Sequence, residues 1–242
     1  MPAIAVVRGL YRYPVKSMAA EPLPVAELSW NGLAGDRRFA FRRIGNMSGM
    51  PWLTATKLGA LVCYRPYHAG AEGDDGRTLR VVTPEGEDLE AGGAALRERL
   101  SQAHGQPVEL LHLRHGIYDE APLSLISTST LRALERASGR ELDVRRFRPN
   151  IVVEAAGGEP FEEDSWIGHV VAFGAPGAAA AMTVSTRDLR CSMVNLDPET
   201  AAPDLRVLRA VGQCHGAYAG VYGSTFTVGT IRIGDEVHRL SP

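Results

Sequence analysis

Cys191 lies in a stretch of sequence that could bind a soft metal or supply a nucleophile. Arg190 stands beside it and Arg187 is close by. Positive neighbours favour the thiolate, which is the form of cysteine that attacks and that binds soft metals. A core cysteine is the alternative, because Leu189, Cys191 and Met193 could share the buried face of a strand and free cysteine is usually buried. On spacing alone, the core cysteine is favoured.

Two stretches near the N-terminus could hold an anion. Lys16 and Ser17 follow Pro14, which would end a strand because proline cannot donate to a sheet ladder. An ammonium and a hydroxyl held there suit a phosphate oxygen or another anion. Arg37 follows Asp36 at the expected start of a strand, where its guanidinium could donate two hydrogen bonds to a carboxylate or phosphate. The alternatives are a solvated turn at Lys16 and an Asp36–Arg37 surface pair, which would contribute little to stability.

Two further arginines flank a phenylalanine just before a proline. In an extended segment Arg146 and Arg148 would project to one side and Phe147 to the other. We expect Arg148 to be extended because Pro149 follows it. Two rigidly held guanidiniums and the amide of Asn150 would form a clamp for an anion and a heterocycle. An arginine-rich surface strand fits the same pattern equally well.

The composition limits the class of protein. The chain has 242 residues, 45% hydrophobic and 22% charged, which supports a packed core. Its net charge of −2 argues against a protein that coats nucleic acid. The three cysteines are too few for a disulfide framework, the N-terminus lacks a secretory signal, and the longest apolar stretch is too short to span a bilayer. We therefore expect a cytoplasmic protein without a membrane span and without a nucleic-acid partner.

Most of the chain is predicted to form short strands separated by glycine and proline turns. Strands are expected over residues 4–13, 24–28, 38–42, 77–82, 108–113, 150–154, 170–173, 181–185 and 225–228. Helices are expected over residues 94–103 and 131–137, the second after a run of Ser and Thr that offers N-cap hydroxyls. The last strands, in residues 230–240, are predicted to form a hairpin with Gly234 and Asp235 at its turn.

This pattern predicts a mainly β protein with a few helices (α+β), barrel-like, with mixed or antiparallel strands. We expect two domains, covering residues 1–105 and 106–242, because glycine and proline near residue 105 interrupt the pattern.

In this order, the short stretches resemble the MOSC-domain proteins that carry an N-terminal β-barrel domain. Among these it resembles the mitochondrial amidoxime-reducing components and the bacterial reductases of N-hydroxylated bases. The resemblance runs from about residue 4 to 240 and implies a β-barrel MOSC core with an N-terminal β-barrel-like domain. Its motifs are Tyr-Pro-Val-Lys-Ser at 13–17, Gly-Asp-Arg at 35–37, Leu-Thr-Ala at 53–55, Asp-x-x-Pro at 119–122, Phe-Arg-Pro-Asn at 147–150, Phe-Glu-Glu-Asp-Ser-Trp at 161–166, Arg-Cys at 190–191 with Asp-Pro at 197–198, and Gly-x-Ile-x-Ile-Gly-Asp at 229–235.

The resemblance implies a molybdenum cofactor, Mo-molybdopterin, whose pterin carries a phosphate and a dithiolene. Cys191 matches the molybdenum ligand and is the expected catalytic residue. The residues that match cofactor contacts are Lys16, Ser17, Arg37, Asp119, Arg148 and Asn150. The implied reaction is the reduction of an N-hydroxylated compound or N-oxide by oxygen-atom transfer. The implied partners are that small-molecule substrate and, because no cysteine cluster follows the motifs, a separate electron-transfer protein of the ferredoxin, flavoprotein or cytochrome type.

Two other functions fit the same resemblance. Cys191 could carry a persulfide in a sulfur carrier or sulfurtransferase, or the chain could bind and deliver the cofactor without catalysis. Some positions depart from the family motifs: Glu120 and Ala121 replace two hydroxyl residues, Thr56 and Lys57 stand where relatives often have arginine, and Ala201 replaces a glycine.

These expectations make geometric predictions. Lys16, Arg37 and Arg148 should face one cavity, although they are far apart in the sequence. The two strand-rich parts should pack closely and share that cavity. Cys191 should be the one cysteine that opens to it, while Cys63 and Cys214 are packed or remote.

Overall fold

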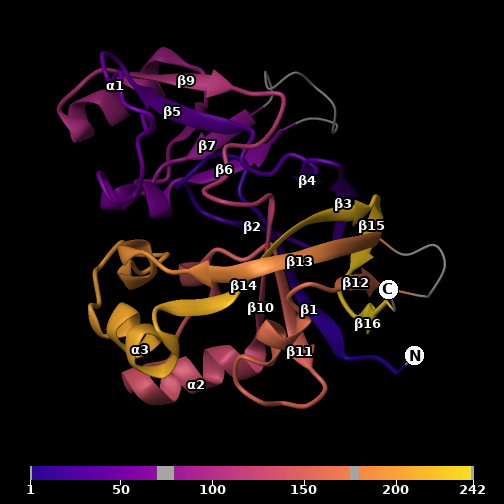
Figure 1. Cartoon of the computed structure of the whole chain (residues 1–242). Helices are drawn as coiled ribbons and strands as arrows, with labels where there is room; N and C mark the ends of the chain where they lie inside the picture. The colour runs from indigo at the N-terminus through magenta and orange to yellow at the C-terminus, as the bar shows by residue number, and fades with distance from the viewer. Residues whose placement is uncertain (1, 70–78, 175–179, 241–242) are drawn as a thin grey trace.

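Seven of the described strands close into a barrel. The computed structural model describes residues 2–69, 79–174 and 180–240 (Figure 1). Around the barrel the strands follow the order β1 (Ala5–Arg12), β11 (Ile151–Ala155), β10 (Leu123–Ser127), β14 (Tyr218–Thr227), β13 (Ala180–Leu189), β12 (Val170–Phe173) and β16 (Glu236–Arg239), and β16 returns to β1. β10 and β11 are parallel, and the other neighbours are antiparallel. The predicted mixed β-barrel is confirmed.

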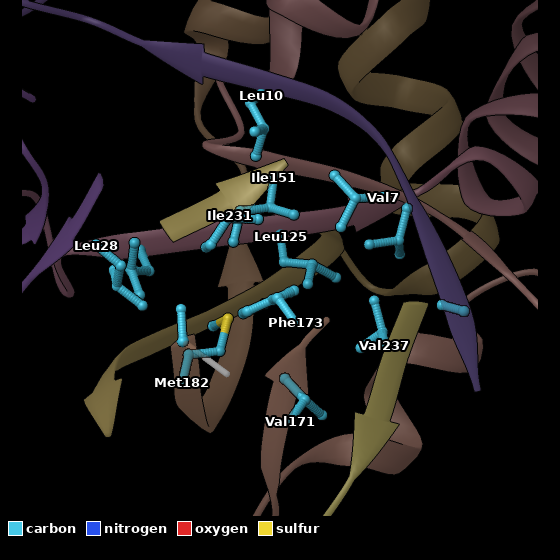
Figure 2. Packing of buried hydrophobic residues seen from close by; sticks show 14 of the residues in the cluster. Val7, Leu10, Leu28, Leu125, Ile151, Val171, Phe173, Met182, Ile231 and Val237 are labelled. Atoms are coloured by element: carbon cyan, nitrogen blue, oxygen red, sulfur yellow. The ribbon is translucent and has the colours of Figure 1, made fainter. Parts of the chain in front are cut away.

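Alternating apolar residues of these strands fill the barrel. Figure 2 shows Val7, Leu125, Phe173, Met182 and Val237, which come from five different strands and lie in one buried cluster. Each of them is at most 1% exposed. Burying a side chain of this size contributes about 1.5–3 kcal/mol relative to leaving it in water. The barrel is therefore a packed core, and a ligand must bind outside its interior.

A second group of strands lies beside the barrel, at the top of Figure 1. Its elements are β5 (Phe39–Arg43) paired with β9 (Val108–His112), the sheet of β6 (Arg65–His68), β7 (Leu79–Val82) and β8 (Asp88–Glu90), the helix α1 (Ala94–His104) and the 3₁₀ turn η1 (Gly59–Cys63). They surround a hydrophobic core of their own. The short strand β2 (Glu21–Leu23) extends the barrel sheet beside β1, and β3 (Val25–Ser29) pairs with β4 (Gly32–Leu33) and with β15 (Gly229–Arg232).

Two helices cover the outside of the barrel. α2 (Thr128–Ser138) carries the chain from β10 to the parallel strand β11, and α3 (Arg206–His215) packs beside it. The Ser127 hydroxyl accepts a hydrogen bond from the Thr130 amide at 3.1 Å, so this N-cap starts α2 three residues earlier than predicted. The helix α3 was not predicted, and Leu205 at its N-cap has no side-chain oxygen to cap it.

The predicted hairpin of residues 230–240 is wrong. β15 pairs with β3, whereas β16 pairs with β12 and β1. The turn itself is bonded to β1, because the Gly234 amide donates to the Val7 carbonyl and the Val7 amide donates to the Asp235 carbonyl, both at 2.9 Å. The two strands therefore pair with different neighbours and form no ladder with each other.

Several strand boundaries also differ from the prediction. β10 was not predicted, and β13 and β14 extend to ten residues each. The first two residues of the predicted strand at 77–82 lie outside the described residues. β1 pairs with strands of the C-terminal half and β9 pairs with β5, so the division at residue 105 stays a prediction. No helix in the described ranges is long and apolar enough to cross a membrane.

Gly223 in β14 is a position where the barrel tolerates no side chain. A Cβ atom there would lie 2.2 Å from the Thr183 carbonyl oxygen and 2.5 Å from the Met182 Cε. We expect Gly223→Ala to lower the free energy of unfolding by about 2 kcal/mol or more through overpacking, measured by urea denaturation. Gly212→Ala in α3 is the control, since nothing lies within 4 Å of its Cβ. Equal midpoints for both variants and the wild type would contradict this packing.

Candidate functional site

A cavity of about 400 Å³ is lined by residues of both strand-rich parts. This volume is in the range that holds small molecules and cofactors. The predicted site residues that line it are Lys16, Ser17, Arg37, Asp119, Arg148 and Cys191. The predictions that the three cations face one cavity, and that the two parts share it, are therefore confirmed.

The backbone is strained at three of these residues. Ser17, Arg37 and Arg148 have φ angles of 67°, 49° and 50°, in the left-handed region. That conformation costs a residue with a side chain about 1–2 kcal/mol. Such strain persists where the surrounding structure imposes it, and it clusters at ligand sites. The fold therefore imposes these conformations on three side chains of one cavity.

The extended conformation predicted for Arg148 is wrong. The preceding residues form the 3₁₀ turn η2 (Val144–Phe147), and Asp143 caps it by accepting a hydrogen bond from the Arg145 amide at 2.8 Å. The Arg148 amide closes the turn on the Arg145 carbonyl at 3.1 Å. These bonds outweigh the preference of a pre-proline residue for extended backbone. Arg146 and Arg148 nevertheless both reach the cavity.

Lys16 is held at the cavity wall by a carboxylate. Its buried Nζ donates to Asp119 Oδ1 at 2.7 Å and to the Ile117 carbonyl at 3.2 Å. Burial lowers the pKa of Lys16, and the Arg37 and Arg148 charges lower it further, while Asp119 opposes both effects. Three positive charges that repel one another in a single wall create a site that favours an anion.

Tyr13 supports the two arginines of this wall. The guanidinium carbons of Arg37 and Arg148 lie 4.7 Å and 4.2 Å from the centre of the Tyr13 ring. The Arg148 Nη1 donates to the Met18 carbonyl at 2.7 Å. Burial lowers the pKa of Arg148 to about 10, so the group is still charged at neutral pH. Tyr13 therefore fixes two positive groups side by side by cation–π contact.

Several guanidinium nitrogens of the cavity wall are unsatisfied. Within the described residues, Arg43 Nε, Arg146 Nε, Arg148 Nη2 and Arg190 Nη2 are buried without a hydrogen-bond partner, and all four side chains line the cavity. An unpaired buried donor costs about 1–3 kcal/mol. A bound anion would supply acceptors to the donors within its reach.

Asn150 is the one predicted site residue that does not line the cavity. It is 1% exposed, and its Oδ1 accepts hydrogen bonds from the Ser124 amide at 3.2 Å and from Arg37 Nη1 at 3.4 Å. Its Nδ2 donates to the Tyr11 carbonyl at 3.2 Å. The geometry therefore supports a positioning role, in which Asn150 ties β1 and β10 to Arg37.

Cys191 follows β13 and precedes the 3₁₀ turn η4 (Ser192–Asn195). It is exposed and is the only cysteine that lines the cavity. Cys63 is half-buried with its Sγ 3.3 Å from the Glu199 carbonyl, and Cys214 is exposed on α3 away from the cavity. The core-cysteine alternative is wrong, because Leu189, which would share the buried face, is 57% exposed.

Sequence reasoning missed several residues of the cavity wall. Trp52 and Tyr222 line it, but no motif marked either of them. Asp188 also lines it and is 1% exposed. Burial raises the pKa of Asp188 to about 6 against the lowering effects of Arg190 and of hydrogen bonds. An acidic residue between two arginines and close to Cys191 was the signal that could have marked it.

Comparison with known families gives two matches along the chain. The MOSC domain model matches residues 103–238, and the model of the MOSC N-terminal beta barrel domain matches residues 4–120.

Relatives and solved structures resemble the chain to different extents. The mitochondrial amidoxime-reducing component 1 of Homo sapiens is 25% identical over 98% of this chain and 83% of its own length. The mitochondrial amidoxime reducing component 2 of Rattus norvegicus is 31% identical, but the alignment covers only 50% of this chain and 38% of that relative. The crystal structure of the YuaD protein from Bacillus subtilis has a TM-score of 0.52 at 14% identity and covers 98% of this chain and 97% of its own, which shows a common fold.

The cationic wall predicts anion binding that depends on Arg148. Inorganic phosphate should raise the melting temperature of the wild type, since a ligand at about ten times its dissociation constant adds about 1.4 kcal/mol. Arg148→Met should lose most of this shift, measured from its own phosphate-free baseline by differential scanning fluorimetry. Arg8→Met is the control, because Arg8 is exposed, pairs with Glu154 and lies outside the cavity. A full phosphate shift in Arg148→Met would refute the assignment.

Proposed function

The chain belongs to the MOSC domain family, and on this premise we propose that it binds a molybdenum cofactor and reduces N-hydroxylated compounds or N-oxides. Relatives named amidoxime-reducing components support the type of reaction. The observation that carries the proposal is the cavity itself. It places one thiol, Cys191, in the same wall as the buried cation Lys16 and the half-buried cations Arg37 and Arg148.

The residues of the cavity fit the molybdenum cofactor. Its phosphate would be held by Lys16, Ser17, Arg37 and Arg148. The strained backbone of Ser17, Arg37 and Arg148 and the unpaired Nη2 of Arg148 fit a fixed anion. The thiolate of Cys191 is a soft donor, which suits molybdenum. Asp119 would keep its place beside Lys16 at the edge of the site, and Asn150 would hold Arg37 from behind.

The cofactor, the cavity residues and the electron donor would contribute differently to the proposed reaction. When bound, the cofactor would supply the two-electron chemistry by which the amine or amidine is formed. The exposed side chains of Met50 and Leu189, together with Trp52, offer an apolar rim that can hold the body of a substrate. The electrons would come from a separate electron-transfer protein.

The direct test measures metal, pterin and turnover on the same sample. Protein made in a host supplied with molybdate should contain molybdenum and a fluorescent pterin. Reduced viologen as a chemical electron donor should then drive the reduction of an aromatic amidoxime or a hydroxylaminopurine. Sulfane sulfur on Cys191 without metal would support a sulfur carrier instead. Bound cofactor without turnover under any donor would support a delivery module.

Cys191→Ser tests the thiol as the metal ligand. Replacing a soft donor by a hard one should lower turnover per bound molybdenum by at least about 100-fold, since changes further from a metal already cost about 10–100-fold. Thermal stability should stay close to that of the wild type, because Cys191 is exposed.

Cys214→Ser is the matched control for this experiment. Cys214 is also exposed, but it lies on α3 outside the cavity, so the variant should keep its turnover. Wild-type turnover per molybdenum in Cys191→Ser would show that the thiol is not the ligand.

A further inference from the structure

Asp188 is a buried carboxyl group that borders the cavity. It lies near the end of β13, and its side chain is 1% exposed. Its Oδ2 lies 2.8 Å from Arg190 Nη1 and accepts a hydrogen bond from the Ser124 hydroxyl at 2.9 Å. Ser124, Asp188 and Tyr222 all line the cavity. A carboxyl group and two hydroxyls thus meet at the wall that also carries Cys191.

Another buried carboxyl group of the chain shows what a purely structural role looks like. Glu163 is fully buried and accepts hydrogen bonds from the Ser127 amide and the Thr130 hydroxyl, at 3.1 Å and 3.0 Å. These hydrogen bonds stabilise the start of α2, and Glu163 lies outside the cavity. Asp188 differs because it borders the cavity, so its proton can reach a bound molecule.

The proposed reduction consumes protons inside the cavity. Reduction of an N-hydroxylated compound breaks the N–O bond, consumes two electrons and two protons, and yields an amine or amidine and water. The lysine and arginines of the wall are cations that release protons poorly at neutral pH. Burial alone would raise the pKa of Asp119, but Lys16 reverses the effect and lowers it, so Asp119 is a poor proton source.

We propose that Asp188 holds a proton for the reduction and passes it through the Ser124 hydroxyl to the oxygen that leaves the substrate nitrogen. The Ser124 hydroxyl turns and gives its proton to that oxygen, and the Asp188 carboxyl group gives its own proton to the Ser124 oxygen. The second proton comes from solvent and forms the new N–H bond, while the separate electron-transfer protein supplies both electrons. Solvent then protonates the Asp188 carboxylate again. This inference rests on the proposed function and assigns its proton source.

The groups that face Asp188 set the pH at which it can act. Burial raises its pKa to about 6, while Arg190 just after β13, Ser124 on β10 and Tyr222 on β14 lower it, and Arg37 lowers it more weakly. Lys16, Asp119 and Cys191 are other ionisable groups of the same cavity. The protonated form of Asp188 therefore predominates below about pH 6 and is lost above it.

The pH profile of turnover distinguishes proton delivery from a structural role. With reduced viologen as electron donor, wild-type turnover per molybdenum should fall as the pH rises through about 6, because the protonated form disappears. Asp188→Asn should be slower by about 100-fold or more and should show no such fall. The asparagine can still accept hydrogen bonds from Ser124 and Arg190, which limits the structural change.

Asp164→Asn is the matched control. Asp164 is another carboxylate that pairs with an arginine of β13, because its Oδ2 lies 2.7 Å from Arg187 Nε. It lies outside the cavity. This variant should keep both the rate and the pH dependence of the wild type.

A second measurement needs no bound cofactor. Infrared difference spectra of the cofactor-free protein, taken on either side of about pH 6, should show the carbonyl band of a buried protonated carboxyl group. The band should be absent from Asp188→Asn. Ser124→Ala should keep the band but lose turnover, which separates the group that holds the proton from the hydroxyl that passes it on.

The outcomes separate this inference from the proposed function. If wild-type protein with bound molybdenum reduces none of these substrates, the proposed function fails and the inference fails with it. If it reduces them and Asp188→Asn keeps the wild-type rate and pH profile, the inference alone fails. Should Asp188→Asn not fold, Ser124→Ala decides: lost turnover with the band retained supports the inference, and wild-type turnover overturns it.

Discussion

The structure depends on holding like charges together in one wall of a cavity. Lys16, Arg37 and Arg148 repel one another, and each must give up water to reach its place. The fold opposes this repulsion with fixed partners. Asp36 is fully buried and lies 2.5 Å from Arg37 Nη1, while the Tyr13 ring lies beneath two of the three cations. These contacts fix positions, but in the part of the chain that the structure describes they leave some guanidinium nitrogens without a hydrogen-bond partner.

The closed barrel brings distant segments of the chain together at the cavity. β1 ends just before Lys16, β11 begins just after Arg148, and β13 ends just before Cys191. Strand pairing connects them: β1 pairs with β11, β11 with β10, β10 with β14, and β14 with β13. The cavity therefore receives the three cations and the thiol from segments far apart in the sequence, while the apolar interior of the barrel stays closed.

The sequence pointed to residues of the cavity but not to the geometry that holds them. Residue chemistry alone left Lys16, Arg37, Arg148 and Cys191 open to structural alternatives, and the resemblance of the short motifs to a family singled them out. All four line the cavity. The left-handed backbone of Arg148 was missed, because hydrogen bonds within its 3₁₀ turn outweigh the local preference set by the following proline. The hairpin prediction was wrong for a similar reason, since β15 and β16 pair with strands from other parts of the chain. Local rules fail where tertiary contacts decide the outcome.

Asp188 shows why burial cannot be inferred from residue type. In the sequence it stands between arginines and has the pattern of a solvated surface pair. In the fold, barrel closure places it against Arg190 and the Ser124 hydroxyl, with almost no contact with solvent. Burial then raises its pKa more than the nearby charge of Arg190 lowers it. The same desolvation disfavours the charged form of Lys16 and of Asp188, so one effect acts on a cation and on an acid of the same cavity.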